Sequence, residues 1–217
     1  MGVVKLMVNM QEIADNLIKG QAPKVKELVQ KAVDEGVKPS EILSEGLIAG
    51  MNVVGTKFKA NEFYIPEVLI AARAMHAGMD IVKPLLSKSD AKSTTTILLG
   101  TVKGDLHDIG KNLVGMMMEG AGFEVIDLGI DVTPEKFVQA VKDKNPNVIA
   151  MSALLTTTMT SMKITIEALK AAGVKDKVKT IIGGAPITQS YADEIDADGY
   201  APDAASAVDK VKELVNV

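Results

Sequence analysis

The feature that most constrains the fold is a regular alternation that begins near residue 95. Short apolar runs rich in β-branched residues recur five times, and each is followed by a stretch with helical periodicity. Strands are expected near residues 95–100, 123–128, 147–151, 178–183 and 197–200. Helices are expected near 108–121, 133–144, 157–172, 187–194 and 203–216. Five β/α repeats predict an α/β fold with a parallel sheet covered on both faces. Five strands favour the flavodoxin-like (Rossmann-like) order 2-1-3-4-5.

The preceding residues predict only helices. Apolar periodicity and Pro or Gly boundary signals place them near 10–19, 23–35, 39–58 and 63–86. Their short connections fit a small antiparallel four-helix bundle. The polar segment 87–93 lacks apolar periodicity and is interpreted as a linker. We therefore expect a helical cap domain over residues 1–88 and an α/β domain over 89–217.

Composition excludes several classes of protein. Apolar residues make up 47% of the 217 residues, which is enough for a substantial core. The 24 Lys and Arg against 28 Asp and Glu argue against a nucleic-acid-binding protein that relies on phosphate contacts. The absence of cysteine excludes disulfides, iron–sulfur clusters, thiolate zinc sites and a cysteine nucleophile. Neither a membrane-spanning run nor a signal-peptide pattern is evident, so a cytoplasmic protein without a membrane partner is expected.

A histidine flanked by acids follows the first expected strand, in the run Gly104-Asp105-Leu106-His107-Asp108-Ile109-Gly110. In an open parallel sheet, ligands bind at the carboxyl ends of the strands, beside the switch point between strands one and three. A metal-binding imidazole usually donates its other N–H to a carboxylate, and Asp105 has the right spacing for that role. A capping or surface histidine is the alternative. Gly104 and Gly110 favour a loop that approaches a ligand closely.

Two further clusters follow the third and fourth expected strands. Ser152 to Thr158 carries four hydroxyls, which fit either a helix N-cap or a polar ligand. Gly183 and Gly184 fit either a tight turn or a place where a bulky ligand lies against the backbone. His76 is the other histidine in the chain and is expected on a helix surface, so a zinc enzyme is not favoured.

Taken together, the three clusters resemble the B12-binding signature of corrinoid proteins. Asp105-x-His107-x-x-Gly110 is followed after 41 residues by Ser152-x-Leu154, and after 28 more by Gly183-Gly184. Residues 50–55 (GMNVVG) and 63–68 (FYIPEV) look like the helical cap module of methylcobalamin-binding proteins, as in methionine synthase. Over nearly its whole length the chain resembles the small corrinoid proteins of methyltransferase systems for methylamines, methanol, methoxylated compounds or betaines.

The resemblance implies a cobalamin cofactor whose cobalt is ligated by His107 in place of the cofactor's own dimethylbenzimidazole. Asp105 would hydrogen-bond His107, and a hydroxyl at Thr158, where the family has serine, would complete a proton relay. Ser152 and Thr156 would contact the displaced nucleotide tail. Tyr64 would cover the upper face of the corrin. Further cofactor contacts implied by the motifs are Gly104, Leu106, Asp108, Ile109, Gly110, Leu154, Gly183 and Gly184.

The function implied is that of a methyl carrier, not catalytic alone, in a corrinoid-dependent methyltransferase system. Its partners would be a substrate-specific methyltransferase, a second methyltransferase that passes the methyl group to tetrahydrofolate or a thiol, and a reductive activator. The cap would move about a hinge at 87–93 to open the upper face. The alternatives are the B12-binding subunit of an adenosylcobalamin mutase and a B12-dependent sensor module. The helical cap argues against the mutase, and the absence of a basic segment argues against a DNA-binding sensor.

Overall fold

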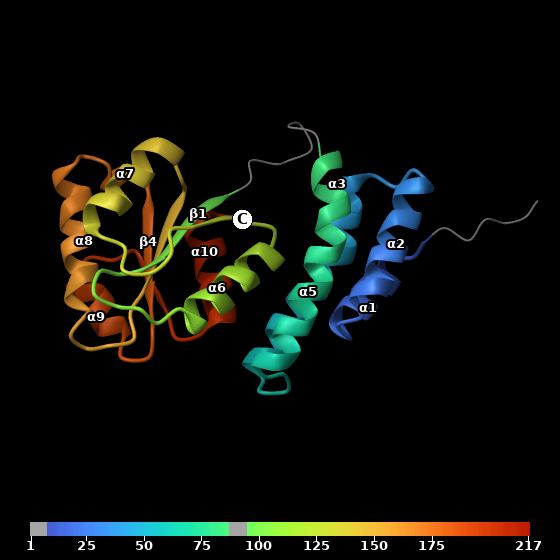
Figure 1. Ribbon diagram of the computed structural model, residues 1–217, viewed down its shortest axis with the longest axis horizontal. Coiled ribbons are helices and arrows are strands. Elements are labelled where there is room, and N and C mark those ends of the chain that lie inside the picture. The colour runs from blue at the N-terminus through green and yellow to red at the C-terminus, as the bar shows by residue number, and fades with distance from the viewer. Residues whose placement is uncertain (1–7, 87–94) are drawn as a thin grey trace, which may run out of the picture. The chain divides into compact units, whose positions relative to one another are not determined.

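The computed structural model describes residues 8–86 and 95–217, which divide into two compact units (Figure 1). The first unit is helical and the second alternates strands and helices. The expected domain boundary at 88/89 and the expected hinge at 87–93 lie outside the described residues. The division into 1–88 and 89–217 therefore stays a prediction. No helix in the described part of the chain is long and apolar enough to cross a membrane.

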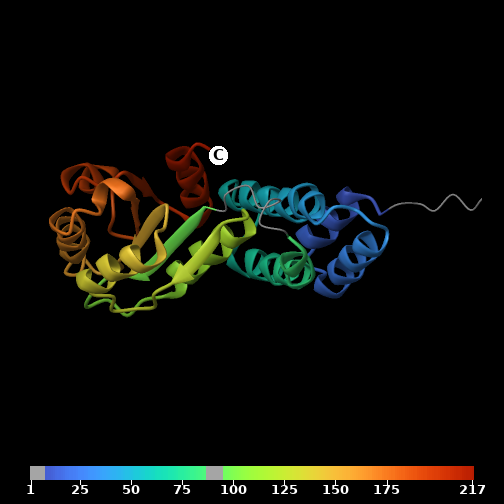
Figure 2. The ribbon, with the colours of Figure 1, turned by 90° about the horizontal axis from the view of Figure 1, so that it is seen from above.

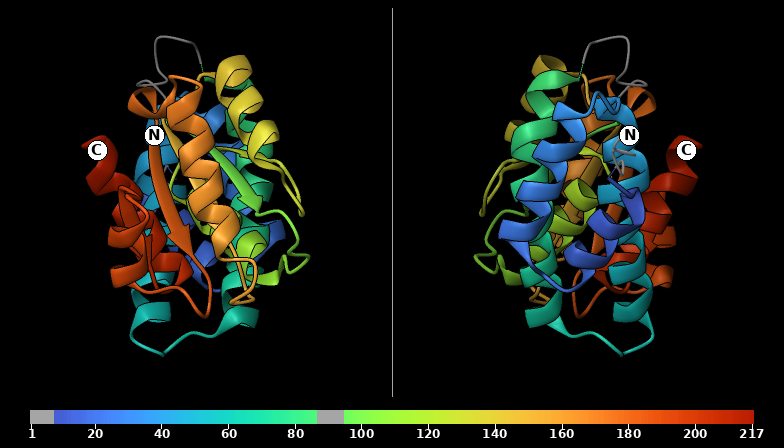
Figure 3. Two further views of the ribbon diagram at one scale, coloured as in Figure 1. Left: turned by 90° about the vertical axis from the view of Figure 1, so that its left-hand side faces the viewer. Right: turned by 90° about the vertical axis from the view of Figure 1, so that its right-hand side faces the viewer.

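The helical unit begins with α1 (Met10–Ile18), whose N-cap Asn9 accepts a hydrogen bond from the Gln11 N–H. The elements that follow are α2 (Ala22–Asp34), α3 (Pro39–Glu41), the π-helix η1 (Ile42–Ile48), α4 (Ala49–Lys59), α5 (Ile65–Val82) and the 3₁₀ turn η2 (Lys83–Leu85). Helix α2 packs against α5, and α1 packs against η1 and α4 (Figure 3, right). Their apolar faces form a core that includes Ile13, Leu17, Val25, Val29, Leu47 and Val68.

Two helices in this unit differ from expectation. The single helix expected over 39–58 is interrupted by η1, whose buried residues Ile42, Gly46 and Leu47 are spaced for a wider turn. A Cβ on Gly46 would lie 3.2 Å from the Ile13 Cγ2, so the missing side chain lets η1 approach α1. The fourth helix leaves α-helical geometry after Val82 because Pro84 has no N–H for the α-helical ladder.

The α/β unit contains a five-stranded parallel sheet in the order β2-β1-β3-β4-β5, as expected from the sequence. Its strands are β1 (Thr96–Thr101), β2 (Glu124–Asp127), β3 (Val148–Ser152), β4 (Lys179–Gly183) and β5 (Gly199–Ala201). Its helices are α6 (Ile109–Gly120), α7 (Pro134–Lys144), α8 (Thr160–Ala171), α9 (Gln189–Glu194) and α10 (Ala204–Val215), with a 3₁₀ turn η3 (Lys175–Lys177) before β4.

Both faces of the sheet are covered by helices. Helices α7, α8 and α9 lie on one face, and α6 and α10 lie on the other (Figures 1 and 2). Phe137 of α7 and Met162 and Ile166 of α8 are fully or almost fully buried in one core cluster with Leu98 and Ile149 of the central strands. Burial on both faces explains why β1 and β3 are continuous apolar runs rather than alternating ones.

The sheet places three loops at one edge. Residues 102–108 follow β1, residues 128–133 follow β2, and residues 153–159 follow β3. Because β1 lies between β2 and β3, the loop that carries His107 has the other two as its neighbours. A single parallel bridge between Val102 and Val132 continues the β1–β2 pairing into the loops.

Candidate functional site

The site centres on the buried carboxylate of Asp105, whose side chain has no exposed surface. One of its oxygens, Oδ1, accepts from the backbone N–H of His107 at 3.1 Å and lies 2.8 Å from the His107 Nδ1. The other, Oδ2, accepts from the backbone N–H of Leu154 at 2.8 Å and of Leu155 at 3.2 Å, and from the Thr158 hydroxyl at 2.6 Å. The carboxylate therefore joins the loop after β1 to the loop after β3.

Burial alone would raise the pKa of Asp105, because it disfavours the charged form. The hydrogen bonds from the Thr158 hydroxyl, the His107 and Leu154 backbone N–H groups and the His107 ring outweigh this effect and hold the pKa of that carboxyl well below its usual range. An ionised carboxylate only accepts hydrogen bonds, so the His107 Nδ1 must carry the proton and donate it. In that tautomer Nε2 carries no proton, so its lone pair can bind a metal ion or another electron-pair acceptor.

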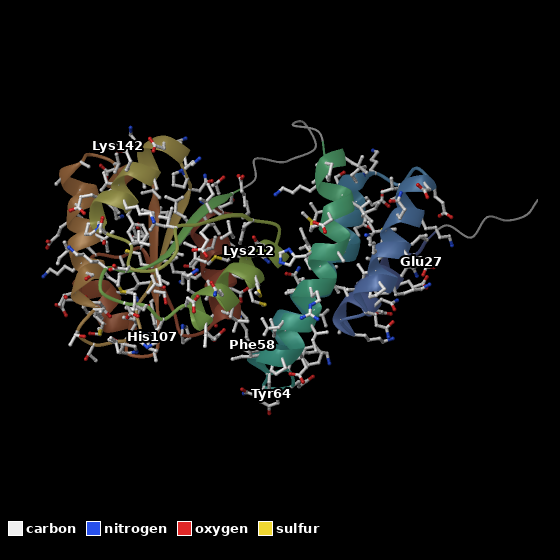
Figure 4. The ribbon with its side chains drawn as sticks, viewed as in Figure 1. Glu27, Phe58, Tyr64, His107, Lys142 and Lys212 are labelled. Carbon is white, nitrogen blue, oxygen red and sulfur yellow. The ribbon has the colours of Figure 1, made fainter. Side chains whose placement is uncertain are left out.

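His107 combines a fixed backbone with an accessible ring. Its carbonyl oxygen accepts from the buried Thr101 hydroxyl at 3.0 Å, while its side chain remains 50% exposed. Figure 4 shows His107 at the loop end of the α/β unit and Lys142, near the C-terminus of α7, at the opposite end. The ring thus sits where a ligand at the carboxyl edge of the sheet can reach it.

Large apolar side chains in the same two loops and at the start of α6 are exposed. Leu106 is 66% and Ile109 77% exposed, and Leu154 and Leu155 are also exposed. Exposure of several large apolar residues around one polar ring is typical of a ligand-binding surface rather than of ordinary protein surface. Here Leu106, Leu154 and Leu155 come from the two loops that Asp105 joins, and Ile109 begins α6 directly after the first loop.

The hydroxyl cluster after β3 divides into two parts. Thr158 is buried and turned toward Asp105, whereas Thr156 and Thr157 are exposed and Ser152 is half-buried at the end of β3. Helix α8 begins at Thr160, three residues later than expected. Residues 154 and 155 donate their N–H groups to Asp105, and residues 155–159 form a turn before the helix.

The glycines at the end of β4, Gly183 and Gly184, have a reason for being glycine that is independent of any ligand. Gly184 has φ +132°, and a Cβ there would lie 1.8 Å from the Ala153 carbonyl oxygen. A Cβ on Gly183 would lie 3.1 Å from the Ala201 carbonyl oxygen. Close packing of the chain at the end of β4 against the neighbouring backbone therefore requires Gly184, and the contact of both glycines with the cofactor stays a prediction.

The remaining candidates are exposed in the structure. Asp108 and Gly110 are exposed at the start of α6, and the Asp108 Oδ2 accepts from the Asn112 side chain at 3.2 Å. Tyr64 belongs to the helical unit, where it precedes α5, donates its N–H to Glu67 and is 63% exposed (Figure 4). Its contact with a cofactor stays a prediction.

Sequence reasoning missed two residues that hold the His107 loop and a third polar residue that is buried in the helix after it. Thr101 is buried at the end of β1, and Asp131 bonds the loop backbone from the β2 side. Lys111 is almost fully buried in α6, with its Nζ 2.5 Å from the Asp127 Oδ2. A polar residue at the end of a strand was the available signal for Thr101. A carboxylate in the loop after the adjacent strand was the signal for Asp131.

Comparison with known proteins gives the family. Two family models, both described as B12 binding domain, match residues 95–209 and 10–83. A dimethylamine corrinoid protein of Methanosarcina barkeri is 46% identical over 207 residues, which is 95% of this chain and 97% of the relative. A trimethylamine corrinoid protein of the same organism is 47% identical over 194 residues, or 88% of this chain and 89% of the relative.

Solved structures of similar fold also belong to cobalamin-binding proteins. A cobalamin-binding protein from Desulfitobacterium hafniense has a TM-score of 0.80 and 34% identity, covering 96% of this chain and 99% of that one. A chain of the methanol:cobalamin methyltransferase complex of Methanosarcina barkeri has a TM-score of 0.82 and 29% identity, covering 95% and 79%. The chain therefore belongs to the B12-binding corrinoid proteins of methyltransferase systems, and its cofactor is a cobalamin or related corrinoid.

Proposed function

We propose that this protein is a methyl carrier that holds its corrinoid through His107, with the cofactor's own nucleotide base displaced. The single observation that carries this proposal is the bond between the His107 Nδ1 and the buried Asp105 carboxylate, which directs the other ring nitrogen outward. The residues fit the group in a second respect. Exposed Leu106, Ile109 and Leu154 offer an apolar surface to a macrocycle beside the ring.

When bound, the corrinoid supplies the cobalt centre that accepts and gives up the methyl group. The protein's own residues would orient the cofactor and exclude water. The anionic Asp105 keeps the proton on the His107 Nδ1 and so keeps the Nε2 available as a ligand. Thr158 and the N–H groups of Leu154 and Leu155 keep Asp105 in place.

The decisive experiment compares the wild type with His107→Ala, using His76→Gln as a control at the other histidine. Purified apoprotein is incubated with hydroxocobalamin, and the absorbance spectrum and the rate of methyl transfer are recorded. We expect the wild type and the control to bind the corrinoid with the spectrum of an imidazole ligand. His107→Ala should lose that spectrum and slow methyl transfer at least about tenfold. An unchanged spectrum and rate in His107→Ala would contradict the proposal.

We further propose a methylamine as the methyl donor and a partnership with two methyltransferases. The relatives named for dimethylamine and trimethylamine are 46% and 47% identical, whereas the chain in the methanol complex is 29% identical. One partner would transfer the methyl group from the methylamine to the bound corrinoid. The other would transfer the methyl group to a folate or thiol. A reductive activator would reduce oxidised, inactive cobalt to the state that accepts a methyl group. Methylation of the loaded protein should depend on a methylamine methyltransferase. Methylation by a methanol enzyme alone would overturn the choice of donor.

A further inference from the structure

The loop between β2 and α7 holds Asp131 in an unusual backbone conformation. Its φ is +52°, in the left-handed region that L residues other than Asn and Asp seldom adopt. Such a conformation persists only where surrounding interactions stabilise it. The bonds made by Asp131 identify those interactions.

Asp131 bonds the His107 loop at two successive residues. Its Oδ1 accepts from the backbone N–H of Gly104 at 2.7 Å. Its own N–H donates to the carbonyl oxygen of Asp105 at 3.1 Å. The left-handed turn at Asp131 presents its N–H and its carboxylate to the same short segment. Gly104 has φ +83°, so both sides of this contact use backbone outside the usual regions.

The bonds to Asp131 act at the point where the loop leaves the sheet. The bridge between Val102 and Val132 brings the two loops together, and the Thr101 N–H donates to the Gly129 carbonyl oxygen at 3.0 Å. On the other side, the Ser161 hydroxyl donates to the Lys103 carbonyl oxygen at 3.0 Å. The backbone of Asp105 is therefore held from β2, while its carboxylate is held from β3.

We propose that Asp131 is a positioning residue for the metal ligand. By fixing the backbone of Gly104 and Asp105, it sets where the Asp105 carboxylate meets the His107 Nδ1, and so where the His107 Nε2 points. The proposal rests on the proposed function of His107. It assigns a role in orienting His107 to the loop after β2, which lies outside the three B12-binding motifs.

Three variants of the full-length protein test whether the Asp131 side chain positions the His107 loop. Asp131→Gly removes the carboxylate, keeps the N–H and suits the positive φ. Asp131→Asn keeps an acceptor and tolerates the same backbone. Asp196→Gly is the matched control, because Asp196 is also an aspartate with φ +61° but lies between α9 and β5, at the opposite edge of the sheet.

The first measurement uses the apoprotein and does not depend on the cofactor. Amide hydrogen exchange of Gly104 should accelerate at least about tenfold in Asp131→Gly, since its N–H loses a charged acceptor. It should change less than about threefold in the control and be largely restored in Asp131→Asn. Unchanged exchange in Asp131→Gly would overturn the proposal.

The second measurement uses protein loaded with hydroxocobalamin and reduced to the Co(II) state. In protein labelled with ¹⁵N-histidine, electron paramagnetic resonance would report a coordinated imidazole as doublet splitting of the cobalt lines, whereas the unlabelled nitrogen of the cofactor's own base would give triplets; only the doublets are scored as nitrogen splitting. We expect the split fraction to fall at least twofold in Asp131→Gly at equal corrinoid content, and to be rescued in Asp131→Asn. A full nitrogen-split signal in Asp131→Gly, despite faster Gly104 exchange, would overturn positioning by Asp131 and leave the role of His107 intact. Absence of nitrogen splitting in the wild type would instead overturn the proposed function itself, and this inference with it.

Discussion

At the scale of single residues, the site is organised by one buried carboxylate, that of Asp105, which accepts several hydrogen bonds at once. Asp105 accepts from the backbone of three residues and from two side chains. Each bond to a buried charged group contributes more than a bond between neutral groups. The loss of any donor therefore leaves a buried charge less well satisfied, which is costly.

Thr158 offers the clearest test at this scale. Thr158→Val keeps the shape of the side chain but removes the hydroxyl that donates to Asp105. We expect the free energy of unfolding of the apoprotein to fall by about 1.5–3 kcal/mol, because the carboxylate loses a short hydrogen bond. Urea denaturation followed by circular dichroism measures the change.

Thr158→Ser is the matched control for the hydroxyl. Serine keeps the donor but lacks the β-methyl group that restricts the threonine rotamer. We expect the stability of Thr158→Ser to lie much closer to the wild type than that of Thr158→Val. Equal losses in the two variants would show that the methyl group, not the bond to Asp105, matters at this position.

At the scale of secondary-structure elements, Gly184 shows how tightly the end of β4 packs. Gly184→Ala would place a Cβ 1.8 Å from the Ala153 carbonyl oxygen, so the backbone of one strand must move. We expect a loss of at least about 2–3 kcal/mol in the free energy of unfolding, measured by thermal or urea denaturation.

Gly173→Ala separates this clash from backbone strain. Gly173 follows α8 with φ +68°, and a Cβ there would meet nothing within 4 Å. Its substitution should cost only about 1–2 kcal/mol, the penalty for the left-handed conformation. A Gly184→Ala protein no less stable than Gly173→Ala would mean that the strand end moves without difficulty.

The same elements show what the sequence could predict. Apolar runs such as 95–100 identified the strands, because a parallel sheet buried on both faces leaves a continuous apolar pattern. The five β/α repeats predicted the strand order, which the structure confirms. The spacing of Asp105 and His107 predicted their hydrogen bond, which the structure confirms. Local patterns were sufficient where the partner lies two residues away.

Interactions between loops were harder to predict. The bonds from Asp131 to Gly104 and from Lys111 to Asp127 join residues 27 and 16 positions apart, and no local pattern specifies such pairs. The π-helix η1 also escaped prediction, and its Gly46 approaches Ile13 of a different helix, which no local pattern specifies. The later start of α8 has a similar cause, since Thr158, inside the expected helix, donates its hydroxyl to Asp105 from the turn that precedes α8.

At the scale of the whole molecule, Asp198 gives stability a pH dependence that is separate from the site. It lies before β5, and its Oδ2 accepts from the Lys175 Nζ at 2.7 Å and from the Thr180 N–H and hydroxyl at 2.8 Å each. Burial would raise the pKa of Asp198, but the bonds from Lys175 and Thr180 lower it below its usual range. The folded protein therefore holds the charged form more strongly than the unfolded chain does.

We expect Asp198→Asn to be about 1.5–3 kcal/mol less stable than the wild type at neutral pH. An unfolded aspartate titrates near pH 4, so the advantage of the wild type should be complete above that pH and should shrink as the pH falls below it. Urea denaturation at several pH values measures the difference. Asp193→Asn, which changes an exposed aspartate in α9, should stay within about 0.5 kcal/mol of the wild type. A difference for Asp198→Asn that stays constant down to pH 2 would contradict this account.

The distance in sequence between Asp105 and its donors also bears on biosynthesis. The bonds to Leu154, Leu155 and Thr158 span 49 to 53 residues, and closing so long a segment is slow compared with forming a helix. While the chain is being synthesised, the carboxylate has no access to these partners until the segment after β3 has left the ribosome. The carboxylate that aligns the His107 ring is consequently secured only once β3 and the loop after it are in place, which ties readiness for the corrinoid to the pairing of β1 with β3.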